Sequence, residues 1–188
     1  MKGNLRKISG IARFSSVPPK YGRLLTNMAA SFGGNGVLEL GTSLGISTMY
    51  LAAGQKDGKV YTIEGCPETL SVAKENFSHC GFSGIRSFSG SFDEMIPEFS
   101  KEGVTPGLIF IDGDHRKEPV LRYYEKVKKI SCDDTVIILD DIHTSSEMGE
   151  AWDEIKKDRD ASTTIDINRF GMVFFRKGMA RFNYVIRY

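Results

Sequence analysis

The chain has 188 residues, of which 40% are hydrophobic, and this length supports one complete core rather than two. Its 25 Lys and Arg residues nearly balance its 24 Asp and Glu residues, so the overall charge favours neither a nucleic-acid partner nor an anionic membrane. No run of the sequence approaches the roughly 18 continuous apolar residues of a membrane span. We therefore expect one cytoplasmic domain over residues 1–188, with no membrane or nucleic-acid partner.

Two further features bear on the cellular setting. The stretch 1–16 is basic but lacks an apolar core of roughly seven or more residues, so it is not predicted to be a secretion signal. The three cysteines, Cys66, Cys80 and Cys132, are odd in number and widely spaced. We expect them to be reduced thiols in the core of a cytoplasmic protein rather than disulfides or metal ligands.

The first predicted element is a helix over residues 20–32. Apolar residues recur there with the spacing of one helix face, Pro18 and Pro19 precede it, and Gly33 follows it. We therefore divide the domain into an N-terminal helical segment, residues 1–34, and an α/β core, residues 35–188.

Short apolar runs and helical patterns then alternate along the core. Strands are predicted at 37–40, 60–63, 108–111 and 136–139, with a weaker candidate at 85–88. Helical spacing lies between them, beginning near Ile46, Pro67 and Val120. This alternation predicts a Rossmann-like, doubly wound α/β fold, with mostly parallel strands and helices on both faces.

The pattern changes in the last third of the chain. Thr144 and Glu147 have the spacing of a capping box, so the last helix is predicted to begin at Thr144. Strand-like runs follow at 163–167, 171–175 and 182–188 with only turns between them, which predicts an antiparallel end to the sheet. The last run could pair across a homodimer, although edge strands are often simply covered.

A glycine turn follows the first strand, which contains Glu39. Gly41 and Gly45 stand where the chain leaves the strand and enters a helix, the place where open α/β sheets bind ligands. Glycine there lets the backbone approach a ligand, and the first free N–H groups of the helix favour an anionic group. The spacing fits neither G-x-G-x-x-G nor a P-loop. Glu64 ends the next strand, where an acid can accept both hydroxyl hydrogens of a ribose.

Glu39, the two glycines and Glu64 together resemble the cofactor site of class I S-adenosylmethionine-dependent methyltransferases. The resemblance implies that the turn wraps the methionine part of the cofactor, that Glu39 lies near its amino end, and that Glu64 holds the ribose. Residues 89–97 resemble the segment that flanks the adenine, with Ser91 where the family often has Asp, and Phe92 either packs on the base or belongs to the core. The implied cofactor-binding residues are Glu39, Gly41, Thr42, Ser43, Gly45, Ser47, Glu64, Gly65, Ser91, Phe92 and Asp112.

Two acids and a histidine recur after the fourth and fifth strands. The fourth is followed by Asp112, Asp114 and His115, and the fifth by Asp140, Asp141 and His143. If these strands are neighbours, their ends lie about 5 Å apart, close enough for Asp112 and Asp140 to share a cation. Carboxylates that close repel one another unless a positive charge offsets them, so the cluster indicates a functional site.

The same cluster resembles the cation-dependent O-methyltransferases of the catechol and caffeoyl-coenzyme A type. By position, the resemblance implies that Asp112, Asp140 and Asp141 hold a divalent cation. Asp141 replaces the usual Asn, and His115 stands where Lys is common. Oxygen ligands alone would suit Mg, Mn or Ca, whereas recruitment of a histidine would favour a softer transition metal.

A bacterial group of small class I methyltransferases is also similar, since its "DDIH" strand end precedes a helix with "EMxxAW". Here that helix contains Met148, Trp152 and Ile155 on one face, so Trp152 is predicted to lie in the core.

We predict an S-adenosylmethionine-dependent O-methyltransferase that acts on a small hydroxylated molecule, with or without a divalent cation. Its predicted catalytic residues are Asp112, His115, Asp140 and His143, because a hydroxyl acceptor must lose its proton to a metal-activated site or to a base. Two alternatives stay open. One is an N-methyltransferase that needs no metal, and the other is a non-catalytic domain that binds S-adenosylmethionine.

Overall fold

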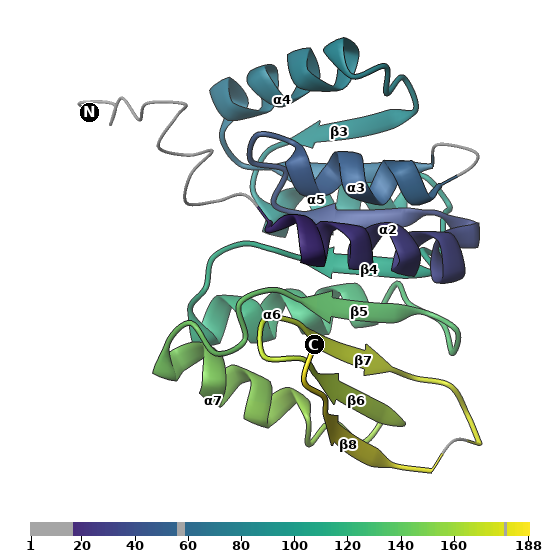
Figure 1. Cartoon of the computed structure of the whole chain (residues 1–188), viewed down its shortest axis with the longest axis vertical. Helices are drawn as coiled ribbons and strands as arrows, with labels where there is room; N and C mark the ends of the chain where they lie inside the picture. The colour runs from purple at the N-terminus through teal and green to yellow at the C-terminus, as the bar shows by residue number, and fades with distance from the viewer. Residues whose placement is uncertain (1–16, 56–58, 179) are drawn as a thin grey trace.

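One eight-stranded sheet organises the chain, in the order β3-β2-β1-β4-β5-β7-β6-β8 (Figure 1). The structure is a computed structural model that describes residues 17–55, 59–178 and 180–188. The expectation about a secretion signal concerns residues 1–16, which lie outside the described residues. The strands are β1 (Val37–Leu40), β2 (Val60–Glu64), β3 (Ile85–Ser89), β4 (Leu108–Ile111), β5 (Val136–Leu139), β6 (Thr163–Asp166), β7 (Gly171–Phe174) and β8 (Phe182–Val185).

Helices cover both faces of the sheet, as the alternation predicts. The helices are α2 (Pro19–Phe32), η1 (Gly33–Asn35), α3 (Ile46–Gly54), α4 (Pro67–His79), α5 (Phe92–Ser100), α6 (Lys117–Lys128) and α7 (Ser146–Ile155). Helices α2 and α3 pack on one face, α5, α6 and α7 pack on the other, and α4 lies against β2 and β3 (Figure 1). None of the helices within the described ranges is long and apolar enough to cross a membrane.

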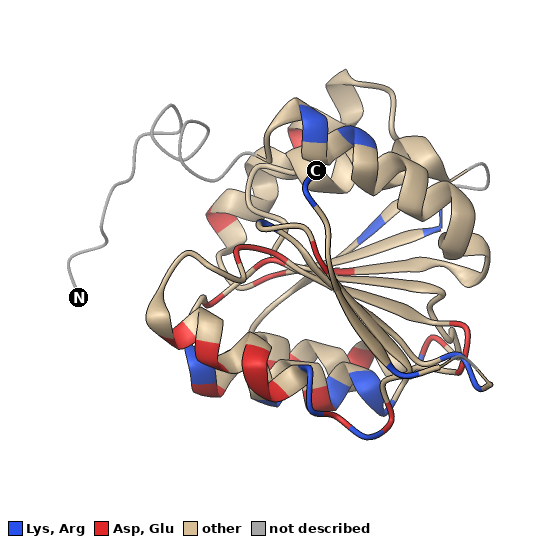
Figure 2. Cartoon of the chain, turned by 60° about the horizontal axis from the view of Figure 1, so that its bottom comes forward, with Lys and Arg blue, Asp and Glu red and all other residues tan. Residues whose placement is uncertain are grey.

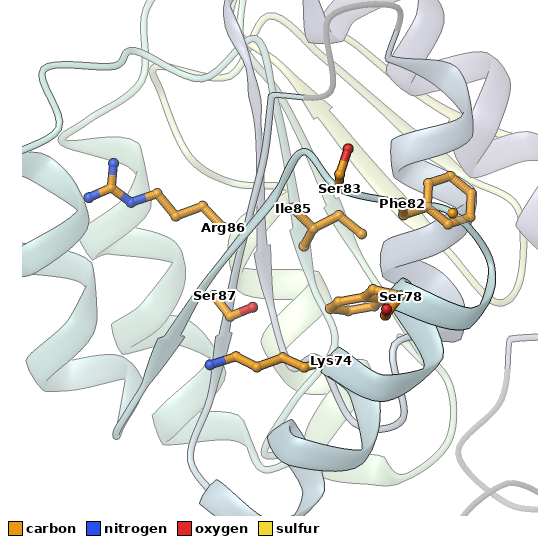
Figure 3. A pocket seen from close by; sticks show the side chains of 9 residues that line it. Lys74, Ser78, Phe82, Ser83, Ile85, Arg86 and Ser87 are labelled. Carbon is orange, nitrogen blue, oxygen red and sulfur yellow. The ribbon is translucent and has the colours of Figure 1, made fainter.

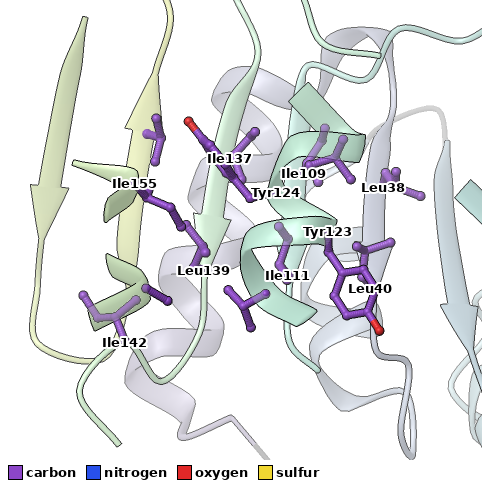
Figure 4. Close-up of a cluster of buried hydrophobic side chains, with 14 of the residues drawn as sticks. Leu38, Leu40, Ile109, Ile111, Tyr123, Tyr124, Ile137, Leu139, Ile142 and Ile155 are labelled. Atoms are coloured by element: carbon purple, nitrogen blue, oxygen red, sulfur yellow. The ribbon is translucent and has the colours of Figure 1, made fainter. Parts of the chain in front are cut away.

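The central strands are buried on both faces because helices lie above and below them. In β1, β4 and β5 every residue is buried. Alternate residues point to opposite sides, so each strand contributes to two cores. One core joins the sheet to α6 and α7 and includes Leu40, Ile111, Tyr124 and Leu139 (Figure 4). Continuous apolar runs are therefore required at these strands, which is why they can be recognised from the sequence.

The C-terminal strands form the expected antiparallel pair, with one difference in the last strand. Strand β7 lies between β5 and β6 and runs antiparallel to both. Strand β6 consequently runs parallel to β5, and its carboxyl end lies at the same edge of the sheet. Because both edges of β7 are taken, β8 pairs with the outer edge of β6, and that pairing is parallel rather than antiparallel.

Strand β8 is the exposed edge of the sheet. Its residues are all exposed, including Phe182 at 55% and Val185 at 83%. Exposed edge strands with apolar side chains are places where a second chain can pair. The pairing of this strand across a homodimer stays a prediction, as does the division of the chain at residue 34.

Two helix starts differ from expectation. Helix α7 begins at Ser146 rather than Thr144, because the hydroxyl of Ser145 accepts a hydrogen bond from the Met148 backbone N–H and caps the helix. Helix α5 was not predicted as a helix. The sequence contains a start signal for this helix, because Ser91 and Glu94 form a reciprocal capping box. Pro97, inside the helix, interrupts the helical pattern.

The cysteines are free thiols, as expected, but their predicted place in the core is wrong. Cys66, Cys80 and Cys132 are all exposed free thiols rather than core residues. Cys66 and Cys80 lie at the two ends of α4, as its flanking residues, and Cys132 lies in the connection between α6 and β5. Apolar neighbours in the sequence did not predict burial here because the chain turns at these positions and leaves the side chains on the surface.

Candidate functional site

The predicted site residues gather at one edge of the sheet. Asp112 directly follows Ile111, and Asp140 directly follows Leu139, residues that are paired in register on neighbouring strands. Glu39 lies in β1, on the other side of β4. Asp166 ends β6, which is parallel to β5, so it reaches the same edge. We call this edge, formed by the carboxyl ends of β1, β2, β4, β5 and β6, the acidic rim.

The glycine turn between β1 and α3 needs both of its glycines for conformation and packing. Gly41 has φ +105° and Gly45 has φ +83°, backbone angles that residues other than glycine rarely adopt. A Cβ atom on Gly41 would overlap the backbone carbonyl of Asp112, and one on Gly45 would overlap the ring of Phe77. The turn therefore lies tightly between β4 and α4, which places the start of α3 at the rim.

Gly45→Ala should lower the free energy of unfolding by at least about 1–2 kcal/mol, because alanine is strained at this φ and its methyl group meets Phe77. Gly149→Ala is a matched control: Gly149 lies in α7 with no atom within 4 Å of an added Cβ, so alanine should stabilise the protein by roughly 0.5–1 kcal/mol. Urea denaturation of both variants tests this. Equal effects of the two substitutions would contradict the assignment of strain to Gly45.

Glu39 is fully buried beneath the glycine turn. Thr48 and Thr62 both donate hydroxyl hydrogen bonds to its Oε2 atom, at 2.5 and 2.7 Å. Its Oε1 atom is the one buried side-chain polar atom among the described residues that has no hydrogen-bond partner. Burial raises the pKa of Glu39 from 4.5 to about 7, against the opposing effect of these hydroxyl groups. An orphaned carboxylate oxygen at this position suits a cationic ligand group.

Glu64 supports the glycine turn from the end of β2. Its Oε2 atom accepts a hydrogen bond from the Ser43 backbone N–H at 2.8 Å, and its Oε1 atom accepts one from the Cys66 N–H at 2.9 Å. The Thr42 and Thr62 hydroxyl groups lie 2.6 Å apart. Since Thr62 donates to Glu39, Thr42 donates to Thr62 in turn. Each Glu64 oxygen keeps a lone pair, so further donors such as ribose hydroxyls can still be accepted.

Other residues predicted to bind the cofactor have contacts within the protein. Ser91 caps α5, because its hydroxyl accepts from the Glu94 backbone N–H. Phe92 packs edge-on against Tyr123, with ring centroids 5.0 Å apart, and is half-buried. Ser47 is buried in the first turn of α3, whereas Gly65 lies beside the end of β3, where an added Cβ would be 3.9 Å from the Gly90 carbonyl oxygen. Their roles toward a cofactor stay predictions.

Asp112 and His115 face one another after β4. His115 Nε2 lies 3.5 Å from Asp112 Oδ1. Burial holds the pKa of Asp112 well above its ordinary range, and the neighbouring Asp140, Glu39 and Asp141 carboxylates raise it further. Both effects favour the neutral form of this carboxyl group.

Asp140 is paired with an arginine that sequence reasoning did not identify. Arg169 Nε donates to Asp140 Oδ1 at 2.8 Å, and Arg169 Nη2 donates to Asp140 Oδ2 at 2.6 Å. The same Nη2 atom lies 3.6 Å from Asp141 Oδ1. In residues 17–55, 59–178 and 180–188, no three His, Cys, Asp or Glu side chains are arranged to hold a metal ion. The metal site expected on Asp112, Asp140 and Asp141 stays a prediction, and in the structure the Arg169 guanidinium engages both oxygens of Asp140.

His143 forms a second pair with a residue that was missed. Its Nε2 atom lies 2.8 Å from Asp166 Oδ2, and the Trp152 indole N–H donates to the same oxygen at 3.1 Å. Burial raises the pKa of Asp166. Hydrogen bonds from the Asn168 N–H, His143 and Trp152 outweigh that effect and hold this pKa below its ordinary value. An ionised Asp166 that is fixed by Trp152 orients the imidazole of His143.

Among the described residues, a second concave region lies away from the acidic rim. A hollow of about 500 Å³ lies between α4 and β3 and is lined by Lys74, Ile85 and Arg86, among others (Figure 3). None of the predicted site residues lines it. Acidic and basic residues alternate over the helices at the bottom of the view in Figure 2. The acidic rim is therefore the best candidate for the functional site.

Comparisons with known proteins identify a matching family and similar structures. A family model described as a methyltransferase domain matches residues 38–142, which run from the second residue of β1 to just after β5 and include Asp112, Asp140 and Asp141. A catechol O-methyltransferase from Niastella koreensis is 33% identical over 130 residues. The match covers 68% of this chain but only 58% of that enzyme, so the chain spans less than two thirds of this relative.

Solved structures share the fold. The O-methyltransferase from Bacillus cereus in complex with SAH has a TM-score of 0.73 at 22% identity, covering 92% of this chain and 93% of that one. The O-methyltransferase TomG from Streptomyces achromogenes in complex with SAM has a TM-score of 0.74 at 20% identity, covering 90% and 89%. These likenesses show the Rossmann-like fold of such enzymes. The family model matches more than half of the residues of this chain, and the chain therefore belongs to the methyltransferase domain family.

Proposed function

We propose that this protein transfers the methyl group of S-adenosylmethionine to a hydroxyl oxygen of a small molecule. The observation that carries the proposal is the orphaned Oε1 atom of Glu39, buried directly behind the glycine turn. The ammonium and sulfonium groups of S-adenosylmethionine are cations, and a cation held at this turn, directly or through a water molecule, would compensate a buried carboxylate. The O-methyltransferase relatives support oxygen as the acceptor atom.

The residues of the rim have distinct tasks in this proposal. When bound, S-adenosylmethionine supplies an electrophilic methyl group, and little covalent help from the protein is needed. Glu64 holds the ribose hydroxyls while its hydrogen bond from the Ser43 N–H keeps the turn in place. Gly41 and Gly45 bring the backbone close to the methionine part. Phe92, beside the end of β3, contacts the adenine. These residues bind, orient and exclude water.

The acceptor hydroxyl must lose its proton, and we assign that step to His143. With the Nε2–H group donating to Asp166, the Nδ1 atom carries a free lone pair that can accept the proton. The imidazolium that results is stabilised by the ionised Asp166 carboxylate. His115 is the weaker candidate, because its Nε2 atom lies 3.5 Å from Asp112, whereas that of His143 lies 2.8 Å from Asp166.

The function is tested with isotopically labelled S-adenosylmethionine and two acceptor panels, one of catechols and other hydroxylated aromatics, the other of matched amines. Calorimetry of cofactor binding precedes the assay. We expect micromolar-range binding and methyl transfer to oxygen. Transfer confined to amines would replace the proposal with an N-methyltransferase. Absence of cofactor binding would remove the enzyme assignment altogether.

His143→Gln should lower kcat roughly 100- to 10,000-fold, the range lost with a general base, while the dissociation constant for S-adenosylmethionine stays within about twofold. His79→Gln is the control, because His79 is exposed and contacts only the Glu75 carbonyl oxygen in its own helix. A kcat for the His143 variant equal to that of the control would exclude His143 as the base and return the assignment to His115.

A further inference from the structure

The pair formed by Arg169 and Asp140 has the geometry of a fixed ion pair. The guanidinium meets both carboxylate oxygens through two parallel hydrogen bonds, at 2.8 and 2.6 Å, which is the strongest arrangement for these groups. A third donor, the Asp141 backbone N–H, also reaches Asp140 Oδ1 at 2.7 Å. The Asp140 side chain is 0% exposed and that of Arg169 is 23% exposed. A cation approaching Asp140 therefore meets oxygens that already have partners.

The backbone holds Arg169 at this position. It lies in the turn between β6 and β7, and this turn reaches the rim because β6 runs parallel to β5. The Ile142 N–H donates to the Arg169 carbonyl oxygen at 3.2 Å, and the Arg169 N–H donates to Ile167 at 2.9 Å. The guanidinium also lies 5.9 Å from the ring centroid of Tyr21 in α2. Contacts from the segment that follows β5, from α2 and from its own turn thus fix the arginine.

The same guanidinium faces the whole carboxylate cluster. Besides contacting Asp140, its Nη2 atom lies 3.6 Å from Asp141. Asp140 and Asp141, together with Asp112, are the oxygen ligands that the resemblance to cation-dependent O-methyltransferases implies by position. A magnesium ion requires near-octahedral oxygen ligands at about 2.0–2.1 Å, and it could bind here only after Arg169 had left both carboxylates. The Arg169 guanidinium thus supplies a positive charge at the position where a metal ion would otherwise bind.

We propose that Arg169 replaces the divalent cation at the acidic rim, so that methyl transfer by this protein proceeds without a metal ion. The inference rests on the proposed function for its catalytic part, but the replacement itself concerns only binding. It has two consequences. The native protein does not bind divalent ions at Asp140, and removal of the guanidinium exposes a set of carboxylates that does bind them.

Manganese binding to the cofactor-free protein tests the replacement independently of activity. The electron paramagnetic resonance signal of free Mn²⁺ is followed while native protein, Arg169→Ala and Arg176→Ala are titrated. Arg176 is the matched control, since it lies after β7 and pairs with the exposed Asp134 far from the rim. We expect no stoichiometric binding up to about 1 mM for the native protein and control, and at least about tenfold tighter binding by Arg169→Ala.

Two results would overturn the proposal. One is stoichiometric manganese binding by the native protein that Asp140→Asn abolishes. The other is manganese binding by Arg169→Ala no tighter than that of the control. Circular dichroism verifies that each variant is folded, and Arg169→Gln, which keeps a polar side chain in the turn, replaces the alanine variant if that one unfolds. If neither Arg169 variant folds, the native titration decides.

The catalytic part is tested separately. Once an acceptor is known, turnover of the native protein should be unchanged by a chelator and by added magnesium. Loss of turnover with the chelator would overturn the metal-free mechanism, even where no manganese is bound in the absence of cofactor. Failure to bind S-adenosylmethionine would instead refute the proposed function, and the manganese titrations would still decide whether Arg169 excludes a cation.

Discussion

Trp152→Ala is expected to lower the free energy of unfolding by roughly 3–5 kcal/mol, the cost of removing a large buried aromatic side chain. Trp152 is 1% exposed and lies in the core between α7 and the sheet. Its ring fills the space beside Gly171, where an added Cβ would meet it. Small domains are stable by only about 5–15 kcal/mol, so this single substitution removes a large part of the total.

The loss has two sources that a second variant separates. Trp152→Phe keeps most of the apolar contact but removes the hydrogen bond from the indole N–H to Asp166, and should lower the free energy of unfolding by roughly 1–3 kcal/mol. Lys101→Ala breaks an exposed ion pair with Glu98 and serves as the control, with a change within about 0.5 kcal/mol. Urea denaturation should be followed by circular dichroism, since Trp152 is the only tryptophan. An alanine variant as stable as the control would show that α7 does not pack on the sheet as described.

Glu39→Gln is expected to become more stable relative to the native chain as the pH rises. The pKa of Glu39 is about 7 in the folded chain and 4.5 when unperturbed, so the folded state binds this proton more tightly. Its contribution to stability is complete below pH 4.5 and is lost as the pH rises through about 7. The difference between these two pKa values corresponds to about 3 kcal/mol in the free energy of unfolding. From pH 4.5 to 8, the glutamine variant should therefore gain about 3 kcal/mol relative to the native chain.

The same substitution should weaken cofactor binding. Hydrogen bonds to charged groups contribute about 1.5–3 kcal/mol, so Glu39→Gln should raise the dissociation constant for S-adenosylmethionine roughly 10- to 100-fold at pH 8. For the native protein the affinity should rise from pH 6 to pH 8, as Glu39 loses its proton and meets a cationic ligand. Glu98→Gln, an exposed change on α5, is the control for both experiments. A pH-independent difference in stability between native protein and variant would contradict the raised pKa of Glu39.

Much of the fold could be predicted because its strands are buried on both faces. Continuous apolar runs such as Leu108–Ile111 and Val136–Leu139 have no other place in a chain of this composition. The gathering of Glu39, Asp112 and Asp140 at one edge follows from the parallel direction of those strands. This gathering can be predicted without knowledge of side-chain contacts, because the carboxyl ends of parallel strands all lie at the same edge of the sheet.

Arg169 and Asp166 could not be predicted in the same way. They lie in or beside a short turn whose sequence has neither helical nor strand period. These two residues lie at the rim because β7 lies between β5 and β6. The spacing of residues in the sequence does not predict that order of strands. The cysteines show a related limit, because burial depends on whether the chain turns at that position. A signal for α5 was present in Ser91 and Glu94 but was interpreted as part of the cofactor loop.

The position of β7 has a consequence for synthesis of the chain. Strands β1 to β5 leave the ribosome first, and Asp140 is then complete at its strand end while its partner, 29 residues later, is still to be made. Until the hairpin of β6 and β7 attaches to β5, the acids at the rim repel one another and the outer edge of β5 stays open. We therefore expect a nascent chain that ends before Arg169 to be sensitive to proteases and to need chaperone protection, with the final sheet forming only after the hairpin is released.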